Sequence, residues 1–102
     1  MEFQGQFLSK SDIDFDDIKY KVIEDIEDLG DSRCIIVKTL SPDYALLLDS
    51  IDIIICEIGS ALSHLAILAR EHNKIVILIE DIISNIPKSG ILSINNNVIK
   101  IR

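Results

Sequence analysis

Three runs of apolar, mostly β-branched residues in the middle of this chain constrain its fold more than any other feature. The runs cover residues 34–39, 51–56 and 74–79. They show little of the polar alternation of a half-exposed strand, and continuous runs of this length are typical of strands that are covered on both faces. With a helix between each pair of runs, they form a strand–helix–strand–helix–strand pattern. The sequence therefore predicts a parallel βαβαβ unit with right-handed crossovers.

The segments between the runs carry helix signals. Ser41, Pro42 and Asp43 supply an N-cap, a proline at the first helical position and an early acid, which predicts a short helix over 42–49. A second helix is expected to begin within a few residues of Gly59. Its apolar residues cover most of its surface, so we expect it to pack firmly against the sheet.

The ends of the chain predict shorter strands. They are expected at 21–23, 91–94 and 98–101, the last two joined through a turn at 95–97. The acid-rich stretch 10–17 is expected to be a loop or an added edge. The predicted fold class is α/β, with the central βαβαβ unit completed into a small β/β/α assembly. Residues 1–102 are expected to form one domain.

Composition excludes several classes of function. The net charge of −7 and the lack of a basic stripe argue against nucleic-acid binding. No apolar run approaches the roughly 20 residues that span a bilayer, and the first ten residues lack the pattern of a secretory signal, so we expect a cytoplasmic protein without a membrane partner. Cys34 and Cys56 lie inside isoleucine-rich runs, which favours buried apolar side chains over a disulfide or metal ligands.

The strongest candidate for chemistry is His64, which lies where a predicted strand gives way to a helix. The start of a helix has unpaired backbone N–H groups and partial positive charge, which favour a phosphoryl group bound there. Ser60 and Ser63 could add hydroxyl donors or cap the helix, and Gly59 would allow a sharp turn and close approach of a phosphate. The same spacing also fits a histidine that is hydrogen-bonded and idle.

The run GSALSHLAILARE at 59–71 resembles the phosphohistidine signature of the mobile (swivelling) domain of PEP-utilising enzymes. That pattern reads Gly-Gly-x-x-Ser/Thr-His-x-Ala-Ile-x-Ala-Arg-Glu. The segment 41–44 resembles the family's Thr-x-Pro-Asp segment, and the similarity is clear over about 33–79. The family includes pyruvate phosphate dikinase, phosphoenolpyruvate synthase, enzyme I of the sugar phosphotransferase system and rifampin phosphotransferase.

The resemblance implies a swivelling β/β/α domain that carries a phosphoryl group on His64 between catalytic domains. It makes the chain the phosphohistidine component of a phosphotransferase, with Gly59, Ser60 and Ser63 as phosphate supports. The domain would bind no metal or cofactor of its own. ATP or PEP, with magnesium, would be held by partner domains of the ATP-grasp type and of the PEP- or substrate-binding type.

Three departures from the family pattern bear on this interpretation. Ser60 replaces the second glycine, and 71–76 lacks the usual helix-ending glycine and the following proline, although Asn73 can take the left-handed conformation. The 102 residues are also too few to hold an ATP-grasp domain or a PEP-binding barrel. Separate partner proteins, a longer parent polypeptide, or a catalytically silent interaction or regulatory module with the same fold therefore remain alternatives.

The other polar groups near the motif predict no catalysis. Arg70 is six residues after His64 and is expected to brace the helix against a neighbouring loop. His72 is about two turns along the helix, too far from His64 to share a metal. The aspartates of the acid-rich stretch lack the glycine and the later glutamate of a calcium loop, so they are read as a solvated surface. These residues are Asp12, Asp14, Asp16 and Asp17.

Overall fold

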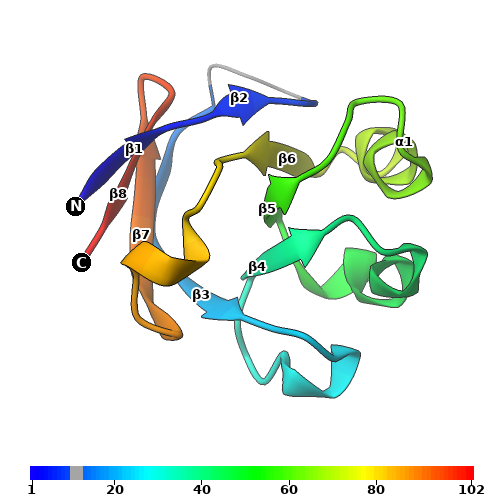
Figure 1. Cartoon of the computed structure of the whole chain (residues 1–102), viewed down its shortest axis with the longest axis horizontal. Helices are drawn as coiled ribbons and strands as arrows, with labels where there is room; N and C mark the ends of the chain where they lie inside the picture. The colour runs from blue at the N-terminus through cyan, green and yellow to red at the C-terminus, as the bar shows by residue number, and fades with distance from the viewer. Residues whose placement is uncertain (10–12) are drawn as a thin grey trace.

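The computed structural model describes residues 1–9 and 13–102 and contains one mixed sheet of eight strands that curls toward a barrel (Figure 1). The strand order is β1-β8-β7-β3-β4-β5-β6-β2. The strands are β1 (Glu2–Gln4), β2 (Gln6–Phe7), β3 (Phe15–Val22), β4 (Cys34–Thr39), β5 (Ile53–Ile58), β6 (Ile75–Leu78), β7 (Ser89–Asn95) and β8 (Val98–Ile101). The helices are η1 (Ile26–Asp28), η2 (Pro42–Ser50), α1 (His64–Glu71) and η3 (Ile83–Asn85).

Strands β4 and β6 lie within the first and third apolar runs, and β5 begins two residues inside the second run and extends to Ile58. The three strands pair in parallel, with β3 added in parallel beside β4. Successive residues of these strands point into two different cores. Ile35, Ile54 and Val76 pack under η2 and α1, and their neighbours Ile36 and Ile55 pack inside the curled sheet, where β7 and β8 add further apolar side chains. Burial on both faces explains why these runs do not alternate with polar residues.

The two crossovers lie side by side on the outer face of the parallel strands (Figure 1). η2 begins at the predicted cap, where the Ser41 hydroxyl accepts from the Asp43 N–H at 3.3 Å, but it is a 3-10 helix throughout. The α1 helix begins at His64, with Ser63 as its N-cap. Whether the assembly is a swivelling β/β/α domain stays a prediction, because a mixed, nearly closed sheet is the architecture seen.

The remaining strands are antiparallel. β7 and β8 form the hairpin expected from the asparagine turn, in which Asn96 and Asn97 have φ values of 53° and 64°. The acid-rich stretch was expected to be a loop or an added edge, and its described end is strand: β3 starts at Phe15, which pairs only with β7, and β3 lies between β7 and β4 only from Tyr20 onward. Residues 10–12, including Asp12, lie outside the described residues.

The N-terminal segment joins the two ends of the sheet. β1 pairs with β8 and β2 pairs with β6, although only Gly5 separates β1 from β2. A Cβ atom on Gly5 would lie 2.5 Å from Ile77 Cγ2, so only glycine fits where the segment crosses β6. Beyond β2, Leu8 donates its N–H to the Val76 carbonyl at 2.8 Å. Residues 1–9 therefore act as a seam that closes the barrel, which the sequence did not predict.

None of the helices within the described ranges is long and apolar enough to span a membrane.

Candidate functional site

His64 is the first residue of α1, and its side chain is exposed. The strand β5 ends at Ile58, and the loop 59–63 leads into the helix at the carboxyl edge of the parallel strands. The segments after β4 and after β6 leave the sheet at the same edge, because the three strands are parallel. The structure therefore places His64 where ligands meet open parallel sheets, as the sequence order indicated.

Backbone amides near His64 are available to an anion. The Ser63 hydroxyl accepts from the Ala66 N–H at 3.4 Å and caps the helix. Within residues 1–9 and 13–102, the N–H groups of His64 and Leu65 meet no acceptor. Two unpaired donors thus adjoin the imidazole at the positive end of the helix.

Ser60 and Gly59 shape the loop in front of the helix. The Ser60 hydroxyl accepts from the Leu62 N–H at 3.1 Å, and its carbonyl accepts from the Ser63 N–H at 3.0 Å. Ser60 does not have a positive φ, so its backbone conformation does not call for the family's second glycine. Gly59 is also outside that region, but a Cβ atom there would lie 2.8 Å from Leu40 Cδ1. Packing of the loop against the end of β4 is therefore one physical reason for glycine at this position.

Two further polar residues at the C-terminal end of α1, Arg70 and the C-cap residue His72, make contacts that do not involve His64. Arg70 donates from Nη2 to the Ala61 carbonyl at 3.0 Å, which confirms that it braces the helix against the preceding loop. His72 lies at the opposite end of α1, where Nδ1 is 4.0 Å from Asp49 Oδ1. Lys74, which follows the helix, donates its N–H to the Ala69 carbonyl at 2.8 Å. The helix is therefore held at both ends, with His64 at the one that faces the carboxyl edge.

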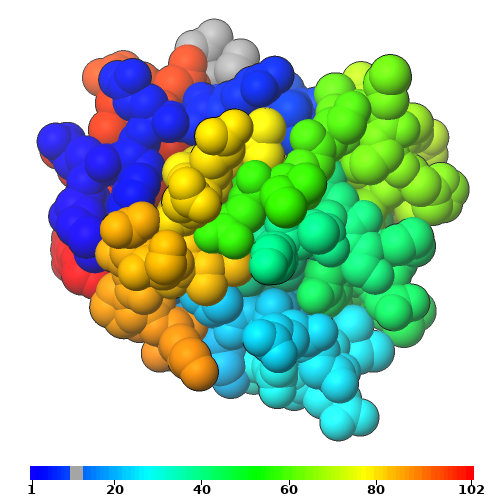
Figure 2. Space-filling view, viewed as in Figure 1, coloured from blue at the N-terminus to red at the C-terminus, as the bar shows by residue number. Residues whose placement is uncertain are grey.

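The sequence did not reveal a hollow at this edge. This hollow has a volume of about 440 Å³. Its lining residues are Lys38, Glu57, Ile58, Gly59, Leu78, Glu80 and Asp81. A second hollow of about 490 Å³ shares Lys38, Glu57 and Asp81 with it. Figure 2 looks onto this face, where the ends of β4, β5 and β6 meet in the middle, coloured from teal through green to yellow. The signal was present, because these charged residues stand at the ends of the three predicted strands.

The electrostatic character of the edge is negative. Burial, followed by the carboxylates of Glu24, Asp25, Asp43 and Asp28, raises the pKa of Tyr44 above its usual value. Glu57 accepts from the Ile83 N–H at 2.9 Å, which fixes this carboxylate beside η3. Among the described residues, no group of three metal-ligating side chains could hold an ion. The first hollow is lined by three carboxylates and one cation.

Comparisons with known proteins agree with the signature around His64. The family described as PEP-utilising enzyme, mobile domain matches residues 30–95, and the chain belongs to this family. The fold is also similar to that of a UPF0107 protein solved by NMR in solution. The TM-score is 0.66 at 9% sequence identity, over 100% of this chain and 99% of the other, so the likeness concerns the fold alone. No curated protein gives a significant match.

Proposed function

We propose that this domain is a phosphoryl carrier, transiently phosphorylated on His64. The observation that carries the proposal is the exposed imidazole at the first position of α1, beside two unpaired backbone N–H groups, inside a segment that matches the mobile-domain family. A neutral imidazole is a competent nucleophile near neutral pH. The positive helix end favours the phosphoryl anion once it has been transferred.

The transfer itself needs little from the domain. A ring nitrogen of His64 forms a bond to phosphorus as the bond between phosphorus and the donor's leaving oxygen breaks, and the electron pair leaves with that oxygen. The second half-reaction reverses these roles toward the acceptor. In the loaded state the amides of His64 and Leu65 would contact phosphoryl oxygens. The hydroxyl oxygens of Ser63 and Ser60 already accept hydrogen bonds from backbone N–H groups, so their hydroxyl protons could be donated to the phosphoryl group.

The proposal also covers the partners and the class of fold. ATP or PEP, with magnesium, would be bound by separate ATP-grasp-type and PEP- or substrate-binding domains or proteins, and this domain would swing or diffuse between them in the cytoplasm. Its mixed sheet would be that of a swivelling β/β/α domain. A carrier that is not tethered to its partners lacks the high effective concentration that a linker supplies, so it must recognise them through its surface.

Intact mass of the protein purified from its native cells under alkaline conditions tests the carrier role. We expect one phosphoryl group that is lost after brief acid treatment and that is missing from His64→Ala. His72→Ala is the matched control, because it removes the other histidine of the chain, which is exposed at the C-cap of α1, and should keep the label. Lack of label on the wild-type protein, also after incubation of cell extract with ATP or PEP, would support a silent interaction module instead.

The stability of His64→Ala makes this result interpretable. The side chain is exposed and donates no hydrogen bond within the described residues, so its removal should change the free energy of unfolding by less than about 0.5 kcal/mol. Urea unfolding followed by circular dichroism checks this value. A large loss of stability would mean that the missing label reflects unfolding.

A further inference from the structure

We propose that the carboxyl edge beside His64 is a docking surface for a protein partner that presents an apolar socket ringed by lysine and arginine side chains. The docking edge is defined by Glu57, Ile58, Leu62, Glu80 and Asp81. The inference rests on the carrier role and adds the chemistry of the partner. Two independent features of the edge support it, one apolar and one electrostatic.

The apolar feature is a cluster of exposed side chains around His64. The large exposed apolar residues of the described chain are Met1, Leu46, Ile58, Leu62 and Ile67. Three of the five fall within the ten-residue segment centred near His64. Leu62 is 84% exposed and Ile58 is 58% exposed, at the two ends of the loop that leads into α1. Exposed leucine and isoleucine side chains that flank a reactive group are suited to insertion into a partner.

The electrostatic feature is an excess of carboxylates along the same edge. The two hollows there are lined by four acids, Glu24, Glu57, Glu80 and Asp81, against the single cation Lys38. Lys38 makes no ion pair among the described residues. At the amino edge, Arg33 is paired with Asp52 at 3.0 Å and Lys74 precedes β6, so cations and carboxylates occur together there. The charge is therefore distributed unevenly along the strand direction.

The charge decides among possible occupants of the edge. A second copy would bring the same four carboxylates against each other, and anionic lipid or nucleic acid would be repelled. Proteins that bind nucleotide or PEP surround the phosphates with cations, so the positively charged rim of such a site attracts the acidic docking edge. Phosphorylation of His64 adds about two further negative charges, which strengthens this attraction for the loaded carrier.

The two features make separable contributions to docking. An apolar anchor in a socket governs mainly the lifetime of a complex, whereas charges at the rim govern mainly the association rate and its dependence on salt. Leu62→Ser should therefore raise the KM for the carrier about tenfold. Glu80→Lys should lower kcat/KM about threefold to tenfold and flatten its dependence on salt.

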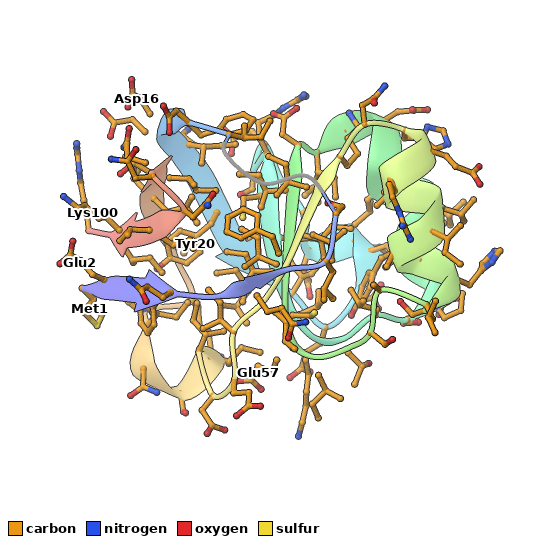
Figure 3. All side chains as sticks on the ribbon, turned by 90° about the horizontal axis from the view of Figure 1, so that it is seen from above. Met1, Glu2, Asp16, Tyr20, Glu57 and Lys100 are labelled. Atoms are coloured by element: carbon orange, nitrogen blue, oxygen red, sulfur yellow. The ribbon has the colours of Figure 1, made fainter. Side chains whose placement is uncertain are left out.

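Matched controls lie outside the docking edge. Leu46 is also a highly exposed leucine, but it lies on η2, so Leu46→Ser removes an equivalent side chain elsewhere. Asp16 is exposed on β3, and Figure 3 shows it on the opposite side of the molecule from Glu57, so Asp16→Lys makes the same charge change far from the edge. Both controls should stay within about twofold of the wild type.

The probe is the polypeptide from native cells that phosphorylates His64 with ATP or PEP, purified by that activity. Initial rates of His64 phosphorylation are measured for the wild type and the four variants between low and high salt. If the wild type is phosphorylated at His64 but all variants react alike and salt has no effect, the docking inference is wrong and the carrier role stands. If His64 is never phosphorylated, the carrier role fails, and the inference fails with it.

Sedimentation of the wild type and of Leu62→Ser tests whether a second copy of the chain covers the docking edge instead of a basic partner. The docking inference expects both proteins to be monomers at the concentrations of the rate assay. A wild-type dimer that Leu62→Ser dissociates would show that a second copy covers the edge, and this would overturn the assignment to a basic partner.

Discussion

The parallel strands β4, β5 and β6 and the antiparallel strands β7, β8 and β1 contribute to one sheet in different ways. Neighbouring residues in the parallel strands are buried on both faces, between the helices on one side and the inside of the barrel on the other. In β8, by contrast, Ile99 and Ile101 are buried and Lys100 is exposed. The parallel half carries the candidate site, and the antiparallel half closes the barrel behind it. Covering a strand on both faces is what turns its sequence into a continuous apolar run.

Paired alanine substitutions are the most severe test of this contrast. Ile54 packs under the helices and Ile55 packs inside the barrel, so Ile54→Ala and Ile55→Ala should each lower the free energy of unfolding by about 2–5 kcal/mol. In β8, Ile99→Ala should cost a similar amount, but Lys100→Ala should cost less than about 0.5 kcal/mol. Urea unfolding of the four variants measures these differences. Equal losses at Ile99 and Lys100 would contradict the one-sided burial of β8.

Substitution in the N-terminal seam that joins the two halves should give the next largest loss of stability. A side chain at Gly5 would collide with Ile77, Ile79 and the Leu78 carbonyl, so Gly5→Val should lower the free energy of unfolding by about 1–3 kcal/mol. Loosening of the seam would also expose the β6 and β8 edges. Faster hydrogen exchange at Val76 and Ile101, whose amides bond within or beside the seam, would locate the damage. Gly30→Val has open space around it but a φ of 60°, so it tests backbone strain without collision.

Cys56, one of the two buried thiols of the parallel half, gives a smaller effect on stability that depends on pH. Burial raises the pKa of the Cys56 thiol from 9.0 to about 11. Because the folded state holds this proton more tightly than the unfolded chain, the contribution to stability is complete below about pH 9 and is lost as pH rises toward 11. Unfolding measured between pH 8 and pH 10.5 should show the decline, and Cys56→Ala should reduce it. An unchanged slope in Cys56→Ala would assign the decline to other groups.

Sequence alone could predict the parallel half because its patterns are local. The three apolar runs, the Ser41 cap and the histidine signature each report on a few consecutive residues, and β4, β5, β6 and the start of α1 occur where these patterns lie. The seam could not be predicted, since β1 and β2 are only three and two residues long and are defined by distant partners. η2 took the 3-10 form although its cap signals are those of an α-helix as well.

The candidate site also has one part that local sequence patterns predict and another that depends on the three-dimensional fold. The histidine, its cap and the glycine before it could be named from the order of residues, and Arg70 could be assigned to bracing from its offset. The charged hollow at the strand ends depends on β4, β5 and the segment after β6 meeting at one edge, so Lys38, Glu57 and Asp81 come together only in three dimensions. Charged residues at the ends of adjacent parallel strands are a sequence signal for such an edge, because parallel strands bring their carboxyl ends together.

The C-terminal end of α1, where this chain lacks the glycine of the family pattern, gives the smallest expected change in the free energy of unfolding. Asn73 has a φ of 60°, donates its N–H to the Arg70 carbonyl at 3.1 Å and is followed by the Lys74 bond to Ala69. Glycine has no steric penalty in this left-handed conformation, so Asn73→Gly should raise the free energy of unfolding by about 0.5 kcal/mol. Asn73→Ala should lower it by about 1 kcal/mol, because alanine is strained there. Neither change should alter phosphorylation of His64 at the other end of the helix, and a loss of label in Asn73→Gly would show that the two ends are coupled.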